Sequence, residues 1–312
     1  MDVYGLGTLA MDVLMKVDVL PKEDGFCIVK SNEKQPGGSG TNVIVQLARL
    51  GAACGYIGAV GDDALGDDVL ESLSKEKVHI GNMVIKPGGI TLHTDIVIDD
   101  GGSKFIMLNM GSAFEELTPE EVNIEAISKA KVFYTDLLPK VPAVHGLKAA
   151  RKNGVKTVFN MQAGLGTMQG LGITKEEILS SLAYVDVFAP CREGLYELTG
   201  TTDLDACAKI LRKYCGGVLL FTLGKGGSVA YDEGDKKHFV PSRVVKVVDT
   251  TGAGDSYIGA FIHHFYLKAK GLEEAMEFAT CCAGYTCTGL GARYSPTLEQ
   301  IAALGAHEVG KL

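Results

Sequence analysis

The feature that most constrains the fold is a regular alternation of short apolar stretches and helix-like stretches in the second half of the chain. Strands are predicted at Val132–Thr135, Val155–Asn160, Val185–Ala189 and Val218–Thr222, and helices between them at Pro142–Lys152, Thr174–Leu182 and Leu204–Tyr214. Strands that alternate with helices form βαβ units, because parallel neighbours need a crossover connection. The pattern therefore predicts an α/β protein with a mostly parallel central sheet flanked by helices.

Two stretches in the first half of the chain do not follow this alternation. Residues of about 13–35 and 90–109 have strand character without helices between them. Inside the second stretch, residues 91–98 and 103–108 flank Asp99-Asp100-Gly101-Gly102, which is a hairpin turn signal. We expect both stretches to form a small β-sheet lid. The 312 residues contain no low-complexity linker, so we expect one domain that covers 1–312.

Charge and composition argue against several classes of function. The net charge of −8, without a basic block, argues against nucleic-acid binding. No apolar run approaches the roughly 18 residues that a membrane span needs. None of the eight cysteines forms a C-x-x-C pair, which argues against zinc, and the first residues lack the basic start of a signal peptide. We therefore expect a cytoplasmic protein with free thiols that binds neither nucleic acid nor membranes.

A glycine-rich turn at residues 249–255 is the strongest sign of a chemical site. An apolar strand end, Val247-Val248, is expected to lead into this turn and then into an apolar helix. The glycines would leave the N–H groups of residues 252–255 uncovered. Together with the positive end of the helix, these groups form an anion hole suited to a phosphoryl group. Asp255 at the rim is placed to accept a proton from a substrate hydroxyl, or else it only caps the helix.

Two further glycine-rich segments are candidate binding sites. Pro36-Gly37-Gly38-Ser39-Gly40-Thr41-Asn42 precedes a helix expected over 43–50. It either lets a polyol approach the backbone or only begins the helix. Thr222-Leu223-Gly224-Lys225-Gly226-Gly227 follows a strand at the edge where α/β proteins bind ligands. It either crosses a nucleotide or only forms a hairpin into 228–231. Since no Walker A motif is present, phosphate binding must use another device.

Taken together and in this order, these segments resemble the ribokinase or PfkB family of carbohydrate and nucleoside kinases. Residues 36–52 resemble the family's N-terminal signature and Asp249–Phe261 its C-terminal signature, while Gly58–Asp63 and Leu117-Thr118-Pro119 match connecting segments. The resemblance covers nearly the whole chain and implies a ribokinase-like fold with a small β-sheet lid. It also implies an ATP-dependent kinase that phosphorylates a hydroxyl of a small sugar or polyol, uses ATP and Mg²⁺, and forms a homodimer through the lid.

The resemblance assigns roles to individual residues. Asp255 matches the family's catalytic base, and Gly252, Ala253 and Gly254 match its anion hole. The implied substrate contacts are Asp12, Gly37, Gly38 and Asn42, and the implied nucleotide loop contains Thr222, Gly224, Gly226 and Gly227. A monovalent cation such as K⁺ is implied at Asp249, Thr251, Thr286, Gly289, Gly291 and Ser295. Arg293 lies in the same loop, and an inward-folded guanidinium there would replace the cation.

Two positions depart from the family pattern. Before Leu198-Thr199-Gly200 the family usually carries Asn-x-x-Glu, which helps to organise magnesium and phosphate, whereas this chain has Cys191 and Gly194 there. Glu193 or Glu197 is the candidate substitute in the magnesium network, or else ATP and water hold the ion. Ala10 stands where ribose-specific members carry asparagine, which argues against a strict ribokinase.

Three alternative functions remain. A dinucleotide enzyme would use Gly5-Leu6-Gly7-Thr8-Leu9-Ala10, but the next segment is poorly helical and ends at Pro21. A non-catalytic sugar-binding member is suggested by the missing Asn-x-x-Glu, although the turn at Asp255 is intact. A nucleoside kinase of the same fold is the third. Aromatic residues make up only 7% of the chain and Trp is absent, so we favour a sugar or polyol.

Overall fold

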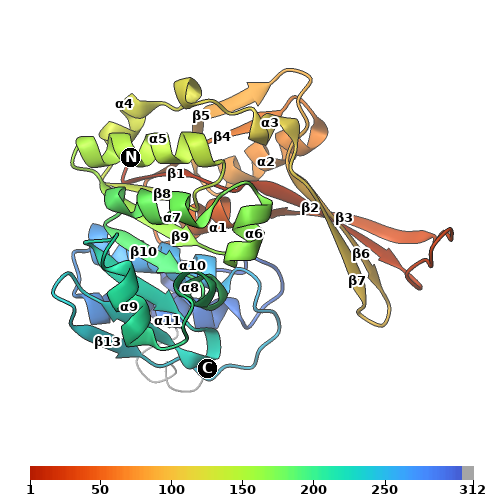
Figure 1. The fold of residues 1–312 in the computed structure, drawn as a ribbon. Helices are drawn as coiled ribbons and strands as arrows, with labels where there is room; N and C mark the ends of the chain where they lie inside the picture. Colours follow the sequence, from red (N-terminus) through yellow and green to blue (C-terminus); the bar gives the residue numbers. More distant parts are fainter. Residues whose placement is uncertain (304–312) are drawn as a thin grey trace.

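The computed structural model describes residues 1–303; residues 304–312, the end of the single domain expected over 1–312, lie outside the described part. The main body is a large sheet with helices on both faces, and a smaller sheet projects from one side of it (Figure 1). This architecture confirms the predicted α/β class with a mostly parallel central sheet and a separate small sheet. No helix among residues 1–303 combines the length and the apolar character needed to cross a membrane.

Within the described residues, the large sheet has nine strands in the order β13-β12-β11-β10-β9-β8-β1-β4-β5. The strands are β1 Val3–Leu6, β4 Cys54–Gly61, β5 His79–Lys86, β8 Val132–Thr135, β9 Lys156–Met161, β10 Val187–Pro190, β11 Val218–Thr222, β12 Ser228–Tyr231 and β13 Lys237–Val240. Neighbours from β5 to β11 are parallel, whereas β12 and β13 pair in the antiparallel sense. The carboxyl ends of the parallel strands therefore share one edge, which is where open α/β sheets bind ligands.

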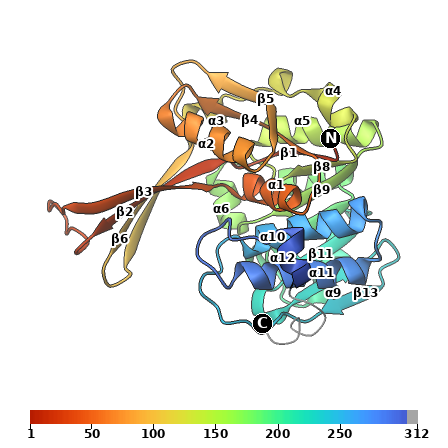
Figure 2. The ribbon, with the colours of Figure 1, turned by 180° about the vertical axis from the view of Figure 1, so that it is seen from behind.

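Helices cover both faces of the large sheet, because each presents an apolar side to it. One face carries α4 Ile124–Ser128, α5 Lys140–Lys152, α6 Leu165–Gly170, α7 Lys175–Ser181, α8 Arg192–Thr199 and α9 Leu204–Leu211 (Figure 1). The other carries α1 Ser39–Arg49, α2 Ala64–Lys75, α3 Ser112–Glu115, α10 Ala253–Ile262, α11 Leu272–Thr286 and α12 Leu298–Ala303 (Figure 2).

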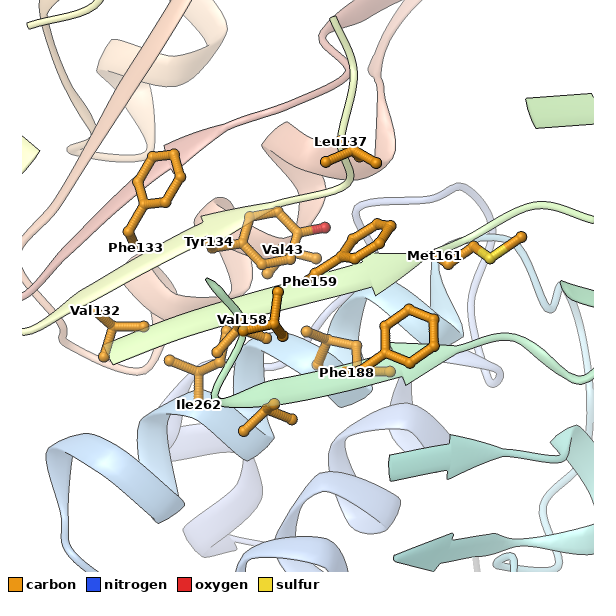
Figure 3. Packing of buried hydrophobic residues seen from close by; sticks show 14 of the residues in the cluster. Val43, Val132, Phe133, Tyr134, Leu137, Val158, Phe159, Met161, Phe188 and Ile262 are labelled. Atoms are coloured by element: carbon orange, nitrogen blue, oxygen red, sulfur yellow. The ribbon is translucent and has the colours of Figure 1, made fainter. Parts of the chain in front are cut away.

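The hydrophobic core fills the space between the large sheet and its helices. Phe159 of β9 and Phe188 of β10 pack with ring centroids 5.2 Å apart, and Val43 of α1 and Ile262 of α10 belong to the same cluster (Figure 3). All four side chains are completely buried. Burial of such a side chain contributes roughly 1.5–3 kcal/mol to stability, so this cluster stabilises the packing of the sheet against its helices.

The small sheet has the order β3-β2-β6-β7 and consists of β2 Ala10–Val17, β3 Val29–Gly37, β6 His93–Asp99 and β7 Lys104–Asn109. β6 and β7 pair around the turn at residues 100–103, as the hairpin signal predicted. β2 follows β1, and β3 leads into α1. The small sheet is therefore joined to the body at the carboxyl edge of β1 and at the amino end of α1.

Two local expectations differ from the structure, and one segment was not predicted. The helix expected over 43–50 begins four residues earlier, at Ser39, because Gly38 takes a positive φ of 85° and starts it. The strand end expected at Val247-Val248 is wrong, since residues 241–252 form no strand. These valines are 52% and 57% exposed, and the Val248 N–H donates to the Cys287 carbonyl at 2.8 Å instead of to a strand. The segment β4-α2-β5 was not recognised from the sequence.

Candidate active site

A cavity of about 380 Å³ opens at the carboxyl edge of the large sheet, beside the small sheet. Its lining comprises Asp12, Gly37, Gly38, Ser39, Asn42, Asn160, Gln162, Cys191, Thr222, Thr251, Gly252, Gly254, Asp255 and Ala292. Four residues predicted to contact substrate are therefore brought together with the predicted turn. Of the predicted nucleotide loop only Thr222 lines the cavity; Gly224–Gly226 form a single 3₁₀ turn, and Gly227 follows it in the hairpin from β11 to β12.

Two helix N-termini converge on this cavity. α1 begins at Ser39 and α10 at Ala253, and residues of both first turns line the cavity. The first N–H groups of a helix have no partner within the helix, and the helix dipole makes that end positive. An anionic group such as a phosphoryl group is therefore favoured between the two helix ends.

Asp255 lies in the first turn of α10 and is held by the first turn of α1. Its Oδ1 accepts a hydrogen bond from Ser39 Oγ at 2.5 Å, and its Oδ2 accepts one from Asn42 Nδ2 at 3.0 Å. Burial raises the pKa of Asp255 to about 6, although both hydrogen bonds and the charge of Arg293 act in the opposite direction. A carboxylate with such a pKa is ionised at neutral pH and still basic enough to accept a proton from a hydroxyl.

The turn before α10 depends on a glycine at position 252. Gly252 has a φ of 76°, and a side chain there would collide with the Ala292 carbonyl. Residues 249–252 therefore lie directly against the loop at residues 286–295. This close contact aims the start of α10 at the cavity.

Asp12 lines the cavity from β2 of the small sheet. Its Oδ1 accepts a hydrogen bond from Thr94 Oγ1 on the neighbouring strand β6. Its Oδ2 lies so close to Gly37 that a Cβ there would be 2.6 Å away. The small sheet thus delivers one fixed carboxylate to the cavity wall.

Arg293 does fold inward, but it reaches α1 and α2. Its Nε donates to Asn42 Oδ1 at 3.1 Å, its Nη1 to Ser72 Oγ at 3.2 Å, and its Nη2 to Thr41 Oγ1 at 3.0 Å and the Gly37 carbonyl at 3.4 Å. Because Arg293 engages Asn42 Oδ1, the Asn42 amide must turn its Nδ2 toward Asp255. Burial lowers the pKa of Arg293 to about 10, so the guanidinium remains charged at neutral pH.

The residues predicted to bind a monovalent cation lie in two adjoining loops. Asp249 Oδ1 accepts from the N–H and hydroxyl of Thr251, and its Oδ2 accepts from the Gly291 N–H at 3.0 Å. The Ser295 carbonyl and hydroxyl accept from Arg49 Nη1 at 2.8 and 3.4 Å. Thr286 Oγ1 donates to the Cys282 carbonyl, and the ring of Tyr294 packs against Gly289. Most of these oxygens thus already serve the protein's own donors.

Glu193 does not line the cavity. It is exposed, and its side chain lies beside Gly164, together with Glu197, whose Oε2 accepts from the Gly166 N–H at 3.2 Å. Cys191, at the position of the family's asparagine, does line the cavity and caps α8 through its Sγ. Among residues 1–303 no group of three or more His, Cys, Asp or Glu side chains is arranged to hold a metal ion.

Several cavity residues were missed from the sequence. Ser39 lies inside a glycine segment that was recognised, but its hydroxyl was not given a role. Asn160 and Gln162 stand at the carboxyl end of β9, where the rule for ligand sites in parallel sheets would have found them. Asp136, just after β8, hydrogen-bonds to Gln162 and carries no sequence motif.

Comparison with known proteins gives one consistent family. The model of the "pfkB family carbohydrate kinase" matches residues 2–299. Fructokinase-1 of Oryza sativa subsp. japonica is 30% identical over 297 residues, covering 89% of this chain and 91% of that protein. The ATP-dependent ribose-1-phosphate kinase of Halopiger xanaduensis is 30% identical over 303 residues, covering 96% and 97%.

The fold agrees with these sequence matches. The crystal structure of ribokinase from Thermotoga maritima superposes with a TM-score of 0.83 at 25% identity, covering 96% of this chain and 98% of that one. A family model that spans nearly all described residues and a shared fold over the same length point to one conclusion. The chain belongs to the PfkB family of carbohydrate kinases, enzymes that transfer a phosphoryl group from ATP to a hydroxyl group.

Proposed function

We propose that this kinase phosphorylates a hydroxyl of a small, uncharged sugar or polyol, with Asp255 as the general base and the turn at residues 252–255 as the anion hole. The observation that carries the proposal is the position of Asp255, which faces the cavity from the start of α10 while Ser39 and Asn42 hold both of its oxygens. In the proposed reaction the acceptor hydroxyl donates its proton to Asp255 as its oxygen bonds to the γ-phosphorus of ATP. The bond from that phosphorus to the β–γ bridging oxygen breaks, and ADP leaves.

The substrate side of the cavity is proposed to lie between the small sheet and α1. Asp12 offers acceptor oxygens to substrate hydroxyls, and Gly37 and Gly38 let the sugar approach the backbone. Asn42, held by Arg293 and Asp255, orients the base. Of the described residues that line the cavity, none is basic and none is aromatic. The cavity lining thus offers an anionic sugar no cationic side chain and a nucleobase no stacking surface, which favours an uncharged sugar or polyol over both.

The nucleotide side is proposed to extend from Thr222 across the loop of Gly224, Gly226 and Gly227. Backbone N–H groups at the start of α10, including that of Gly254, would hold the transferring phosphoryl group. The Ala253 N–H, which was also predicted for the anion hole, donates to the Thr250 carbonyl at 3.2 Å in this structure. Mg²⁺ fits this site as a companion of ATP, since it prefers phosphate oxygens and water to an all-protein cage. When bound, the ion offsets the charge of the phosphates. Glu193 would contribute only through water from its place beside Gly164.

Two of the residues expected around K⁺ have oxygens that accept hydrogen bonds within the protein. Asp249 accepts three donors from Thr251 and Gly291, and Ser295 accepts from Arg49. The dependence on K⁺ stays a prediction of the family resemblance.

The protein is further proposed to be a cytoplasmic homodimer that associates through the small sheet. All eight cysteines are free thiols, as expected in a reducing compartment. On the edge strand β7, Phe105, Ile106, Met107 and Leu108 are each more than half exposed. An apolar edge strand of this kind is normally covered by a partner.

The test is ATP consumption with a matched substrate panel. We expect turnover with a neutral sugar or polyol, and at least tenfold lower kcat/KM with ribose 1-phosphate and with nucleosides. A nucleoside as the best substrate would favour the nucleoside kinase alternative. Sugar binding without ADP formation would favour the non-catalytic alternative.

A further inference from the structure

Gln162 is a cavity residue to which the proposed function gives no role. Its Nε2 donates to Asp136 Oδ2 at 3.1 Å and to Thr8 Oγ1 at 3.2 Å. Both hydrogens of the amide are therefore used inside the protein. Its Oε1 has no hydrogen-bond partner among residues 1–303, although the side chain lines the cavity. The free acceptor is thus available to a ligand.

Asp136 fixes the orientation of this amide. Its carboxylate is completely buried, and it accepts from the N–H of Thr8 at 2.8 Å and of Leu138 at 3.1 Å as well as from Gln162. It lies against Gly7, where a Cβ would be only 2.7 Å from Oδ1, so the carboxylate has no room to move. A reversed amide would bring Gln162 Oε1 against carboxylate oxygens, which only accept hydrogen bonds when ionised.

The surroundings of Gln162 belong to the substrate side of the cavity. Its partner Thr8 contacts the start of α1, because the Thr8 carbonyl accepts from the Thr41 N–H at 3.1 Å and lies against Gly38. Thr8, Asp136 and Gln162 follow three adjacent parallel strands, β1, β8 and β9. The Gln162 Oε1 atom and the nearby negative charge of Asp136 repel a phosphate oxygen, whereas a substrate hydroxyl can donate a hydrogen bond to Oε1.

We propose that Gln162 is a specificity-determining residue that accepts a hydrogen bond from a second hydroxyl of the substrate, and that Asp136 is the positioning residue that holds its amide in that orientation. The inference rests on the proposed sugar or polyol kinase function. It adds that the substrate carries a second hydroxyl, besides the phosphorylated one, and that this second hydroxyl donates to Gln162.

The first test measures kcat/KM of the parent enzyme and of Gln162→Leu with the best substrate from the panel and with its deoxy analogues. Each analogue lacks one hydroxyl. One analogue should lose about 2- to 12-fold in kcat/KM with the parent enzyme, the range for one uncharged hydrogen bond. In Gln162→Leu this loss should disappear, the losses for the other analogues should persist, and the KM for ATP should change less than twofold. Gln169→Leu is the matched control, because this glutamine is exposed on α6 and does not line the cavity.

The outcomes separate this inference from the function on which it rests. If the parent enzyme is active but Gln162→Leu keeps every analogue's loss, or raises the KM for ATP and not for the sugar, Gln162 is not the contact. A parent enzyme without turnover of any sugar or polyol overturns the function as well.

The second test addresses the positioning role of Asp136. Asp136→Asn cannot accept from all three N–H partners, so it should lose the same hydroxyl discrimination while Gln162 is still present. The sugar KM should rise more than kcat falls. If Asp136→Asn does not fold by circular dichroism, Thr8→Val removes one partner of the amide and should weaken the same discrimination. Unchanged discrimination in the folded variant overturns the positioning role.

Discussion

Asp255 is subject to two opposing influences at the scale of single residues. The cavity removes it from water, which raises its pKa to about 6, while Ser39, Asn42 and the charge of Arg293 stabilise its ionised form. As a result, the Asp255 carboxylate is ionised at neutral pH and is a stronger base than an ordinary carboxylate. The hydrogen bonds from Ser39 and Asn42 also fix both of its oxygens, so these two residues set its orientation as well as part of its basicity.

Asp255→Asn is expected to lower kcat by about 10²–10⁴-fold, because an amide cannot take the hydroxyl proton. Steady-state kinetics with the best panel substrate provide the measurement. Sugar binding measured by calorimetry should persist, since Asp12 and the glycine segment are unchanged. A kcat within threefold of the parent enzyme would remove Asp255 as the base.

The pH dependence should report the raised pKa of Asp255. The base works ionised, so kcat/KM should fall about tenfold per pH unit below about 6 and be level above it. Arg293→Gln removes a positive charge that lowers this pKa, so the acid limb should move to higher pH, and Arg293→Lys should move it less. An acid limb at the same pH in both variants and the parent enzyme would contradict this role of Arg293. The titration of ATP is common to all three enzymes and therefore cancels from the comparison.

At the scale of elements, the site depends on where helices and strands end. The sequence predicted β8 and β11 with their observed bounds, because β-branched and aromatic runs are bounded there by turn residues. It did not reveal β4, whose glycines suppress the strand pattern. A side chain at Gly55 would collide with the ring of Tyr4, and one at Gly58 would collide with Leu9. Both contacts join segments that are far apart in the sequence. For the same reason, the hydrogen bond between Gln162 and Asp136 could be recognised only once β8 and β9 lay side by side.

The apparent strand at Val247-Val248 shows the converse error. β-branched residues favour a strand only where a neighbouring strand can pair with them. Here the large sheet already ends at β13, and the segment returns along α11 to bring the turn to the cavity. The turn and the helix after it were therefore predicted as they are observed, whereas the strand expected in front of the turn is absent from residues 241–252.

The small sheet should contribute sugar affinity but little nucleotide affinity. Asp12→Ala removes the carboxylate that β2 delivers, and loss of a hydrogen bond to a charged group costs about 1.5–3 kcal/mol. The sugar KM should therefore rise by about 10- to 150-fold, and the ATP KM should stay within twofold. Glu33→Ala is the control, because this carboxylate is exposed on the adjacent strand β3. An unchanged sugar KM with a weakened ATP KM would reverse the assignment.

At the scale of the whole molecule, the small sheet projects from the body (Figures 1 and 2). Among the described residues its two edge strands, β3 and β7, each pair on one side only. All residues of β7 are exposed, and four consecutive ones are apolar. The same sheet carries Asp12 into the cavity. A partner bound to β7 would therefore also limit how far the cavity wall can move.

Charge on β7 should convert the proposed dimer into a monomer. The parent chain should have twice its 33.0 kDa mass in light scattering. Alternate residues of a strand face opposite sides, so Phe105→Glu with Met107→Glu charges one face and Ile106→Glu with Leu108→Glu charges the other. At least one of these double variants should give 33.0 kDa, because a buried carboxylate without a partner opposes association.

Phe239→Glu is the matched control, since Phe239 is 56% exposed like Phe105 but lies on β13 of the large sheet. A parent chain that is monomeric at every concentration, or two double variants that both remain dimeric, would exclude β7 as the dimer surface. If the sugar KM rises in the monomeric variant while the ATP KM does not, association also stabilises the position of Asp12.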